Sequence, residues 1–331
     1  MSAPLRIVGT GMWVPERVLT NADLEKMVET SDEWIQARTG IKERRIADEK
    51  TTTADMGARA ALAALEDGGV DAAEIDAVVV ATATPDRLLP AMACDIQAMI
   101  GTRNAVAFDV WGACTGWLYG VNVAKGLVAS EQARTVLVIG AEKLSSIVDW
   151  TDRGTCVLFG DAAGAAVLTA SDDPKRGFLS TYMKSDGTLG DLLYRPPARG
   201  LNPAIPIDIE VLSEDGNYMK MAGPEVFKSA VRSMCDAAEK ALERAGITAA
   251  EVDLLIPHQA NTRIIEATAK YAGIPMDRVW MNIQRYGNTS SASIPVSIHE
   301  ARRCGRIRDG SVTLFVAFGS GFTWASAVVR W

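Results

Sequence analysis

The chain has 331 residues, 48% hydrophobic and 23% charged, and its 34 basic and 41 acidic residues give a net charge of −7. Such a composition can bury a large core, and the length allows two domains or one doubled unit. The acidic balance argues against nonspecific nucleic-acid binding, and no apolar run is long enough to cross a membrane. The N-terminus has no signal-peptide core, so we expect a cytoplasmic protein with no membrane insertion and no nucleic-acid partner.

Short apolar runs alternate with helical stretches along the whole chain. Strands are predicted at 5–9, 77–82, 105–110, 135–140, 164–169, 177–183, 253–257, 279–283, 312–317 and 324–330. Helices are predicted over 53–67, 91–100, 114–129, 224–245, 261–272 and 291–303. Strands that are apolar throughout and lie between helices indicate an α/β protein with helices on both faces of its sheets. The Gly-, Pro- and Asp-rich stretch 184–218 is predicted as a long excursion.

The sequence repeats itself at an offset of 177 residues. Gly-Val-Asp-Ala-Ala-Glu-Ile-Asp at 69–76 is matched by Gly-Ile-Thr-Ala-Ala-Glu-Val-Asp at 246–253. The preceding helices match at the same offset, and the strands beginning at Thr135 and Thr313 match at an offset of 178. Three matches in the same order indicate duplication. We expect halves 1–175 and 176–331 to face each other in α/β/α/β/α layers, with the site between them.

Cys114 stands where a predicted strand gives way to a predicted helix. A helix N-terminus favours a thiolate through its dipole and its free N–H groups, so this residue is a candidate nucleophile. A buried inert thiol is the alternative that local sequence leaves open. The five cysteines are an odd number without a Cys-x-x-Cys pair, which indicates reduced thiols rather than disulfides or zinc. The inert interpretation is given to the other four, Cys94, Cys156, Cys235 and Cys304.

His258 and Asn288 are the candidates to assist this thiol. The chain has only two histidines, and His258 follows an apolar strand, where α/β proteins place reactive groups. A structural histidine is its alternative, and His299, on a predicted helix, is expected to be structural or exposed. Asn288 follows a glycine, a pair that is often only a turn. The repeat, however, places position 288 near the counterpart of Cys114.

The chain resembles the β-ketoacyl-acyl carrier protein synthase III family along nearly its whole length. No single segment is decisive, but their joint occurrence in order is specific. The matching segments are 9–11, 20–25, 30–35, 38–41, 151–155, 159–165, 221–223, 225–228, 257–261, 287–290 and 318–324. The resemblance implies the thiolase fold, a duplicated five-layer unit that is usually a homodimer, and an acyltransferase that initiates fatty-acid synthesis.

The resemblance also implies the roles of the three candidates. Cys114 would take an acyl group from a short acyl-CoA, and malonyl-acyl carrier protein would then enter. His258 and Asn288 would donate hydrogen bonds to the malonyl thioester as it decarboxylates. The backbone N–H groups of Cys114 and Ser320 would form the oxyanion hole. Acyl-CoA is a substrate here, and the family needs no metal or other cofactor.

Further residues receive roles by the same resemblance. Asn261 is expected to support the catalytic histidine. Trp34 and Arg153 would flank the adenine of CoA, because an indole and a guanidinium both stack on a flat base, and Arg38 would contact a phosphate. Leu89 is expected at the acyl pocket, where acetyl-specific members often carry phenylalanine. A basic patch for the carrier protein is assigned to Lys228, Arg263 and Lys270, with a solvated charged face as its alternative.

The sequence also bears on several rival functions. A dinucleotide loop at Gly9-Thr-Gly11 fails because position 14 is valine rather than glycine. A degradative thiolase would carry a second catalytic cysteine in the late glycine-rich loop, where Phe318-Gly-Ser-Gly-Phe322 has none. A condensing enzyme or acyltransferase of secondary metabolism with another starter or acceptor stays open. A noncatalytic acyl-binding protein is disfavoured by the intact Cys-His-Asn set.

Overall fold

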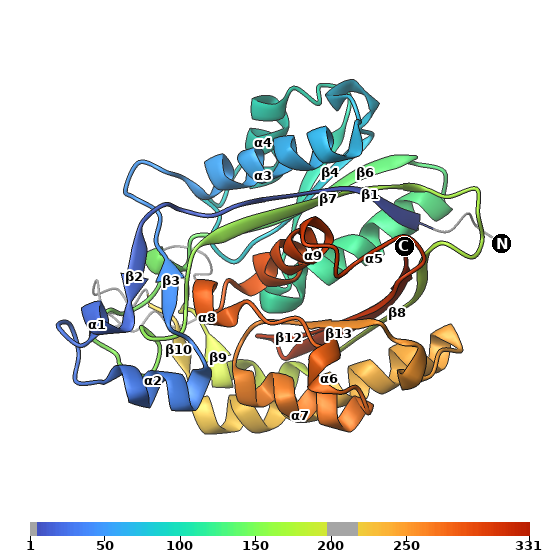
Figure 1. Ribbon diagram of the computed structural model, residues 1–331. Coiled ribbons are helices and arrows are strands. Elements are labelled where there is room, and N and C mark those ends of the chain that lie inside the picture. The colour runs from blue at the N-terminus through green and yellow to red at the C-terminus, as the bar shows by residue number, and fades with distance from the viewer. Residues whose placement is uncertain (1–4, 197–217) are drawn as a thin grey trace.

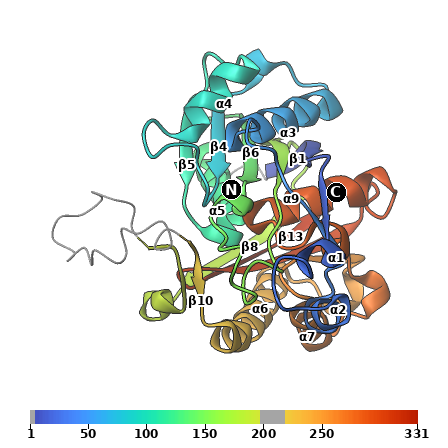
Figure 2. The same ribbon diagram turned by 90° about the vertical axis from the view of Figure 1, so that its left-hand side faces the viewer.

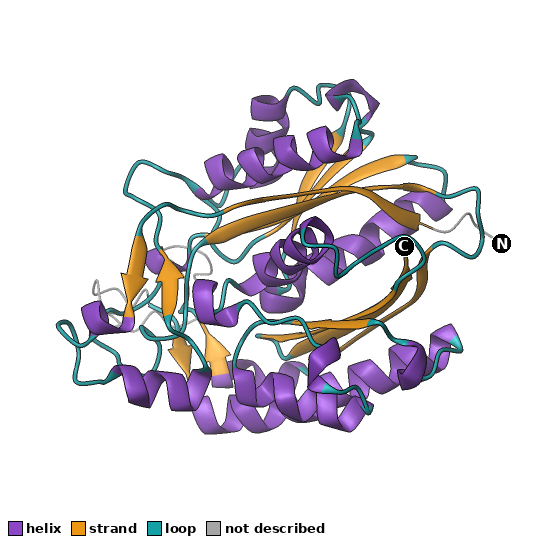
Figure 3. Cartoon of the chain, in the orientation of Figure 1, coloured by secondary structure: helices purple, strands orange, loops and turns teal. Residues whose placement is uncertain are grey.

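Two β-sheets lie one above the other, with helices above, between and below them (Figure 1). This computed structural model describes residues 5–196 and 218–331. Helices α3 (Thr53–Gly68) and α4 (Met92–Ile100) form the outer layer on one side, and α6 (Gly223–Ala245) and α7 (Thr262–Ala272) form the outer layer on the other. Helices α5 (Gly116–Ala129) and α9 (Ser293–Arg303) fill the middle layer. The alternation of helix and strand layers is the predicted five-layer α/β architecture (Figure 3).

The two sheets have the same strand order and the same strand directions. The first has the order β1-β7-β6-β4-β5 and the second β8-β13-β12-β11. The pair β4 and β6, or β11 and β12, is parallel, and the next two pairings are antiparallel. Strand β5, which pairs with β4 in parallel at the edge of the first sheet, has no counterpart in the four-stranded second sheet. The strands of the first sheet are β1 (Leu5–Trp13), β4 (Ala77–Ala81), β5 (Val106–Val110), β6 (Thr135–Glu142) and β7 (Ala162–Ala170). Those of the second are β8 (Gly177–Ser185), β11 (Leu254–Pro257), β12 (Val312–Gly319) and β13 (Thr323–Arg330).

Smaller elements lie at one end of the layers, on the left of Figure 1. They are β2 (Val18–Thr20), α1 (Asn21–Leu24), α2 (Asp32–Thr39), β3 (Glu43–Arg45), β9 (Leu193–Tyr194), β10 (Lys220–Met221) and α8 (Ile283–Tyr286). The predicted excursion 184–218 contains β9, which pairs with β10 beyond it, while its residues 197–217 lie outside the described ranges.

The predicted strand 279–283 is wrong. Only Val279 makes a bridge, with Leu255, and Trp280 N–H donates to Leu255 O at 2.8 Å. The next two N–H groups, of Asn282 and Ile283, donate instead to the Gln259 side chain at 3.0 and 3.2 Å. The chain therefore leaves the sheet after one residue and forms α8.

Close backbone packing explains the glycine pair near the N-terminus. A Cβ atom on Gly9 would lie 2.2 Å from Ala64 O, and one on Gly11 would lie 2.1 Å from Ala60 O. Both alanines are buried on the face of α3 that covers β1. The glycines thus let α3 approach the sheet, which agrees with rejecting a dinucleotide loop there.

The middle layer is packed between the sheets, as the turned view also shows (Figure 2). On α5, Trp117 is buried and meets Phe315 of β12 edge to face, with ring centroids 6.3 Å apart. His299 on α9 lies with Nδ1 3.0 Å from Thr10 O of β1, which confirms its structural expectation. In the described ranges, no helix is long and apolar enough to span a membrane.

Candidate active site

Cys114 lies in a 3-10 turn, Ala113–Thr115, between β5 and α5. Ala113 has a φ of 44°, a left-handed conformation that is unusual for a residue with a side chain. The turn at Ser290–Ala292 before α9 begins in the same way, with Ser290 at φ 48°. Positions 113 and 290 are one repeat offset apart, so both halves build the same strained turn, and the two turns touch in the middle layer.

The resting Cys114 side chain is a thiol. Burial raises its pKa to about 12, and the Glu142 carboxylate adds to the rise, while a hydrogen bond with the Ser290 side chain opposes it. A helix N-terminus stabilises an anion by up to about 2 kcal/mol, which lowers a pKa by about 1.5 at most. The expectation that the helix start favours a thiolate is therefore wrong for the resting chain, because desolvation outweighs the dipole.

His258 directly follows β11, and hydrogen bonds hold both its backbone and its imidazole ring. Its N–H donates to Val316 O of β12 at 2.7 Å, and its Nδ1 lies 2.6 Å from the Ser293 hydroxyl at the start of α9. The residue is only 2% exposed, and desolvation lowers the pKa of its imidazole to about 3. His258 is therefore neutral near pH 7, and Nε2 is the nitrogen left for a substrate.

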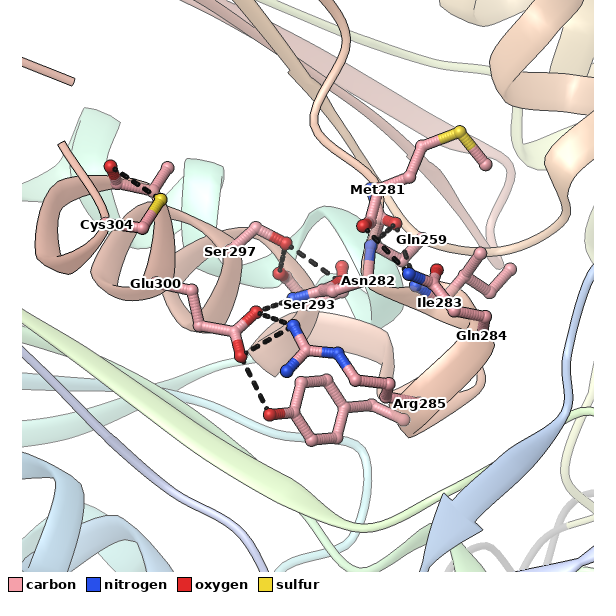
Figure 4. Close-up of polar contacts among 12 residues, drawn as sticks. Gln259, Met281, Asn282, Ile283, Gln284, Arg285, Ser293, Ser297, Glu300 and Cys304 are labelled. Atoms are coloured by element: carbon pink, nitrogen blue, oxygen red, sulfur yellow. Dashed lines mark hydrogen bonds and ion pairs between the residues drawn. The ribbon is translucent and has the colours of Figure 1, made fainter. Parts of the chain in front are cut away.

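A chain of hydrogen bonds, buried near Ser293 and reaching the surface at Arg285, supports the helix that holds Ser293 (Figure 4). The Ser297 hydroxyl donates to Ser293 O at 2.7 Å and to Asn282 Oδ1 at 3.2 Å. The Asn282 amide donates to Glu300 at 2.8 Å, and Glu300 is paired with Arg285 at 2.9 Å. This network fixes α9 against α8 and so fixes the hydroxyl behind the imidazole.

Asn288 is clamped by its backbone. Its N–H donates to Leu158 O at 2.8 Å, and its carbonyl accepts from Gly160 N–H at 3.1 Å. The side-chain Oδ1 accepts from Ser290 N–H at 2.9 Å. Because Oδ1 is occupied, Nδ2 is the group free to donate elsewhere. Its bond to Ser290 ties Asn288 to the turn that also contacts Cys114.

The Ser320 loop lies directly against Cys114. A Cβ atom on Gly319, at the end of β12, would lie 2.8 Å from Cys114 N, so only glycine allows this approach. The Thr115 and Thr323 hydroxyls join the two loops at 2.8 Å, and Thr323 also donates to Ser320 O at 3.1 Å. The two backbone N–H groups predicted for the oxyanion hole therefore come from adjoining loops.

Sequence reasoning missed Glu142, Ser290 and Ser291. Glu142 is fully buried at the end of β6, where Ser291 Oγ donates to it at 2.8 Å and Ala83 N–H at 3.0 Å. Desolvation raises the pKa of this carboxyl, and Ser290 hydrogen-bonds to both Glu142 and Cys114. A buried glutamate at a strand end was the available signal, but its partner Ser291 lies 149 positions away in the chain.

Trp34, Arg38 and Arg153 come together at the edge of the molecule. The Arg38 guanidinium lies 4.7 Å from the centroid of the Trp34 ring, and that of Arg153 lies 4.9 Å from it. Arg153 also donates to Glu29 O at 2.9 Å. The two elements that carry them, α2 and the loop after Asp149, are thus joined over one indole.

The expectation that Asn261 supports the histidine is wrong for this structure. Its Oδ1 accepts from Arg263 N–H at 2.9 Å and caps α7, and its Nδ2 donates to Arg38 O at 2.8 Å. These bonds place Asn261 beside Arg38, whose guanidinium lies over the Trp34 ring. Ser293 is the side chain behind the imidazole, and an ordinary serine at a helix start gave no signal of it.

The remaining predicted residues lie on the surface. Leu89 is 86% exposed, so within one chain it does not line an enclosed pocket. Lys228 is exposed on α6, and Arg263 and Lys270 are exposed on α7, which packs against α6. Arg263 lies 5.2 Å from the Phe227 ring centroid, so this residue and the neighbour of Lys228 are in contact.

Two family profiles match the chain. The profile described as 3-oxoacyl-[acyl-carrier-protein (ACP)] synthase III matches residues 108–187, which include Cys114. The profile described as the C-terminal part of the same synthase matches residues 242–331, which include His258 and Asn288.

Curated relatives match over nearly the whole chain. A β-ketoacyl-[acyl-carrier-protein] synthase III of Roseiflexus castenholzii is 53% identical over 325 residues, covering 98% of this chain and 97% of the relative. The synthase III of Caldanaerobacter subterraneus is 49% identical with the same coverage.

Solved structures agree with the sequence matches. The synthase III of Aquifex aeolicus superposes with a TM-score of 0.91 at 46% identity, covering 99% of this chain and 100% of that chain. A priming β-ketosynthase from the R1128 polyketide pathway superposes with a TM-score of 0.91 at 34% identity, covering 99% of this chain and 96% of that chain.

Proposed function

Because this chain belongs to the β-ketoacyl-[acyl-carrier-protein] synthase III family, which has the thiolase fold, we propose that it condenses a short acyl-CoA primer with malonyl-acyl carrier protein. It is an acyltransferase that initiates fatty-acid synthesis. The observation that carries the proposal is the meeting of three residues at the turn Ser290–Ala292 and the first residue of the helix that follows it, Ser293. Cys114 hydrogen-bonds to the first serine of the turn, Asn288 accepts from the same serine, and His258 bonds to Ser293 directly after the turn.

In the first half-reaction, the Cys114 sulfur attacks the acyl-CoA carbonyl. A bond forms between Sγ and the acyl carbon, the carbon–sulfur bond to CoA breaks, and the thiol proton ends on the CoA sulfur. The N–H groups of Cys114 and Ser320 are proposed to hold the oxyanion formed on the way. This assignment is supported by the close approach of Gly319, the residue before Ser320, to the backbone nitrogen of Cys114.

In the second half-reaction, the malonyl group loses carbon dioxide. The electrons of the broken carbon–carbon bond move to the thioester oxygen, where His258 Nε2 and Asn288 Nδ2 are proposed to donate hydrogen bonds. The enolate carbon then attacks the acyl carbon, and the Cys114 sulfur leaves. Neutral donors stabilise the enolate without pairing with the departing carboxylate as an ion. Burial, which keeps His258 neutral, supports this assignment.

The Ser293 hydroxyl supports the tautomer that this step requires. If the hydroxyl donates to Nδ1 across the 2.6 Å contact, the imidazole proton stays on Nε2 and can be donated to the substrate. We therefore assign Ser293 as a residue that orients His258.

CoA is proposed to bind at Trp34, with Arg38 on a phosphate and Arg153 on the adenine. Their meeting over one ring supports the assignment, and a base can enter only after Arg153 moves off the indole. Lys228, Arg263 and Lys270 are proposed to receive the acidic carrier protein, supported by their exposure on adjoining helices. The chemistry uses only protein groups and the two substrates.

A cytoplasmic homodimer is proposed as the working form. Strand β5 is an edge of its sheet, and two nearby apolar side chains are exposed, Val106 by 54% and Trp111 by 62%. An exposed strand edge with apolar neighbours is a surface that a second copy can cover. Leu89 would then reach an acyl pocket only together with the partner chain.

The test is intact-protein mass spectrometry with a panel of acyl-CoAs, followed by malonyl-acyl carrier protein. We expect one donor to add its acyl mass to the wild type and none to add it to Cys114→Ala. We also expect the acyl group to leave as a β-ketoacyl carrier product. Acylation without discharge to malonyl carrier would favour the acyltransferase of secondary metabolism instead, and the absence of acylation by any donor would contradict the proposal.

A further inference from the structure

A cavity of about 550 Å³ lies far from Cys114 and is lined by an unusual number of arginines. Six arginines line it, against two aspartates, Asp67 and Asp309. They come from β1, the segment before β8, the end of α9, the segment between α9 and β12, and the end of β13, and are Arg6, Arg176, Arg302, Arg303, Arg308 and Arg330. Such a cluster stands out in a chain whose net charge is −7.

Four of these six arginines make no ion pair with a described carboxylate. Arg302 pairs with Asp67 at 2.9 Å, and Arg176 pairs with Asp309. No described carboxylate lies within ion-pair distance of the other four, Arg6, Arg303, Arg308 and Arg330. The Nε atom of Arg330 is buried and has no hydrogen-bond partner among the described residues. Gathered like charges repel one another, and a bound anion would remove that cost.

The cavity is separate from the proposed active site. In the β12–β13 ladder, Arg330 pairs with Val312, while Gly319, which touches Cys114 N, pairs with Thr323 at the opposite end. Seven strand steps separate the two ends, which is roughly 23 Å at about 3.3 Å per residue. The arginines therefore do not act on the acyl group, and the proposed reaction leaves them without a role.

Size and wall chemistry limit the class of ligand. A single phosphate is far smaller than 550 Å³, a volume within the range of sites for drug-sized ligands. Guanidinium groups match phosphate oxygens in pairs. Apolar and aromatic side chains, including Ile7, Val329 and Trp331, complete the wall. The centroid of the Trp331 ring lies 5.5 Å from the Arg302 guanidinium. We propose that this cavity binds a pyrophosphate-bearing small molecule of nucleotide size.

The test is isothermal titration calorimetry of the full chain with inorganic pyrophosphate and with ADP. The background variant Arg153→Ala removes the contribution of the proposed CoA site. In that background we add Arg6→Ala together with Arg303→Ala, because both residues are exposed and neither takes part in an ion pair with a described carboxylate. Arg306→Ala is the matched control, since this exposed arginine donates to Asp277 O and does not line the cavity.

We expect saturable pyrophosphate binding at about 50 mM salt that weakens as salt rises. Losing both arginines should weaken it by about tenfold or more, since one charged hydrogen bond contributes about that factor. Arg306→Ala should stay within about twofold, and ADP should bind at least as tightly as pyrophosphate. The proposal is overturned by the absence of saturable binding, by loss in Arg153→Ala alone, by equal loss in Arg306→Ala, or by ADP binding tenfold more weakly than pyrophosphate.

Discussion

Replacing Ser293 with alanine should slow decarboxylation while leaving the acylation of Cys114 nearly unchanged. The Ser293 hydroxyl lies 2.6 Å from His258 Nδ1, and each of these residues is only 2% exposed. Water cannot readily replace the lost hydroxyl in so closed a position. The imidazole then loses the group that favours a proton on Nε2. That N–H group is the one proposed to donate a hydrogen bond to the enolate oxygen.

The size of the effect follows from the bond that is lost. A buried polar atom left without a partner costs about 1–3 kcal/mol, and each 1.4 kcal/mol is a factor of ten in a rate or an equilibrium. We therefore expect carbon dioxide release from malonyl carrier protein to fall by about tenfold to a hundredfold in Ser293→Ala. Acyl transfer from acyl-CoA, which does not use Nε2–H in the proposed scheme, should stay within about twofold.

The assay follows the two half-reactions separately, by mass gain at Cys114 and by release of carbon dioxide. Ser297→Ala is the matched control, because its buried hydroxyl bonds to Ser293 O in the same helix and to Asn282 before α8, and no hydrogen bond joins it to His258. We expect Ser297→Ala to reduce thermal stability without slowing decarboxylation relative to acylation. The reasoning fails if both variants slow decarboxylation equally, or if Ser293→Ala slows acylation as much as decarboxylation.

Three further outcomes follow from the site. Iodoacetamide should alkylate Cys114 about tenfold faster per pH unit up to pH 10, because the pKa of its thiol is about 12, and a plateau below pH 9 would contradict this value. Burial lowers the pKa of His258 from 6.5 to about 3, so the unfolded chain alone takes up this proton below pH 6.5. The free energy of unfolding should fall by up to about 1.4 kcal/mol per pH unit from pH 6.5 towards 3, and the fall should be shallower in His258→Gln in urea titrations. Gly319→Ala should lose most acyl transfer because its Cβ would lie 2.8 Å from Cys114 N, and full activity of a folded variant would refute the close approach.

The repeat made most of the fold predictable. Once 69–76 and 246–253 are matched, the strands and helices of one half predict those of the other, and the two sheets do share their order. The strand at 279–283 failed because an apolar run does not reveal where its N–H groups bond. There, the Gln259 side chain takes two donors that a sheet would have used.

The site could be predicted only in part. Cys114, His258 and Asn288 carry recognisable motifs. The structure connects Cys114 and Asn288 to Ser290, and His258 to Ser293 directly after that turn. Ser293 and Glu142 carry none, because a serine or a glutamate is ordinary at the end of any element. Their roles depend on tertiary contacts, and the Glu142–Ser291 bond joins the two halves of the chain.

The most direct test of the proposed mechanism compares the two half-reactions in His258→Ala. We expect this variant to gain the acyl mass at Cys114 at close to the wild-type rate. It should then fail to discharge the acyl group on malonyl carrier protein, with carbon dioxide release reduced at least about a hundredfold, as removal of a major electrostatic donor predicts. Wild-type decarboxylation in His258→Ala would contradict the assignment of this imidazole as the enolate donor.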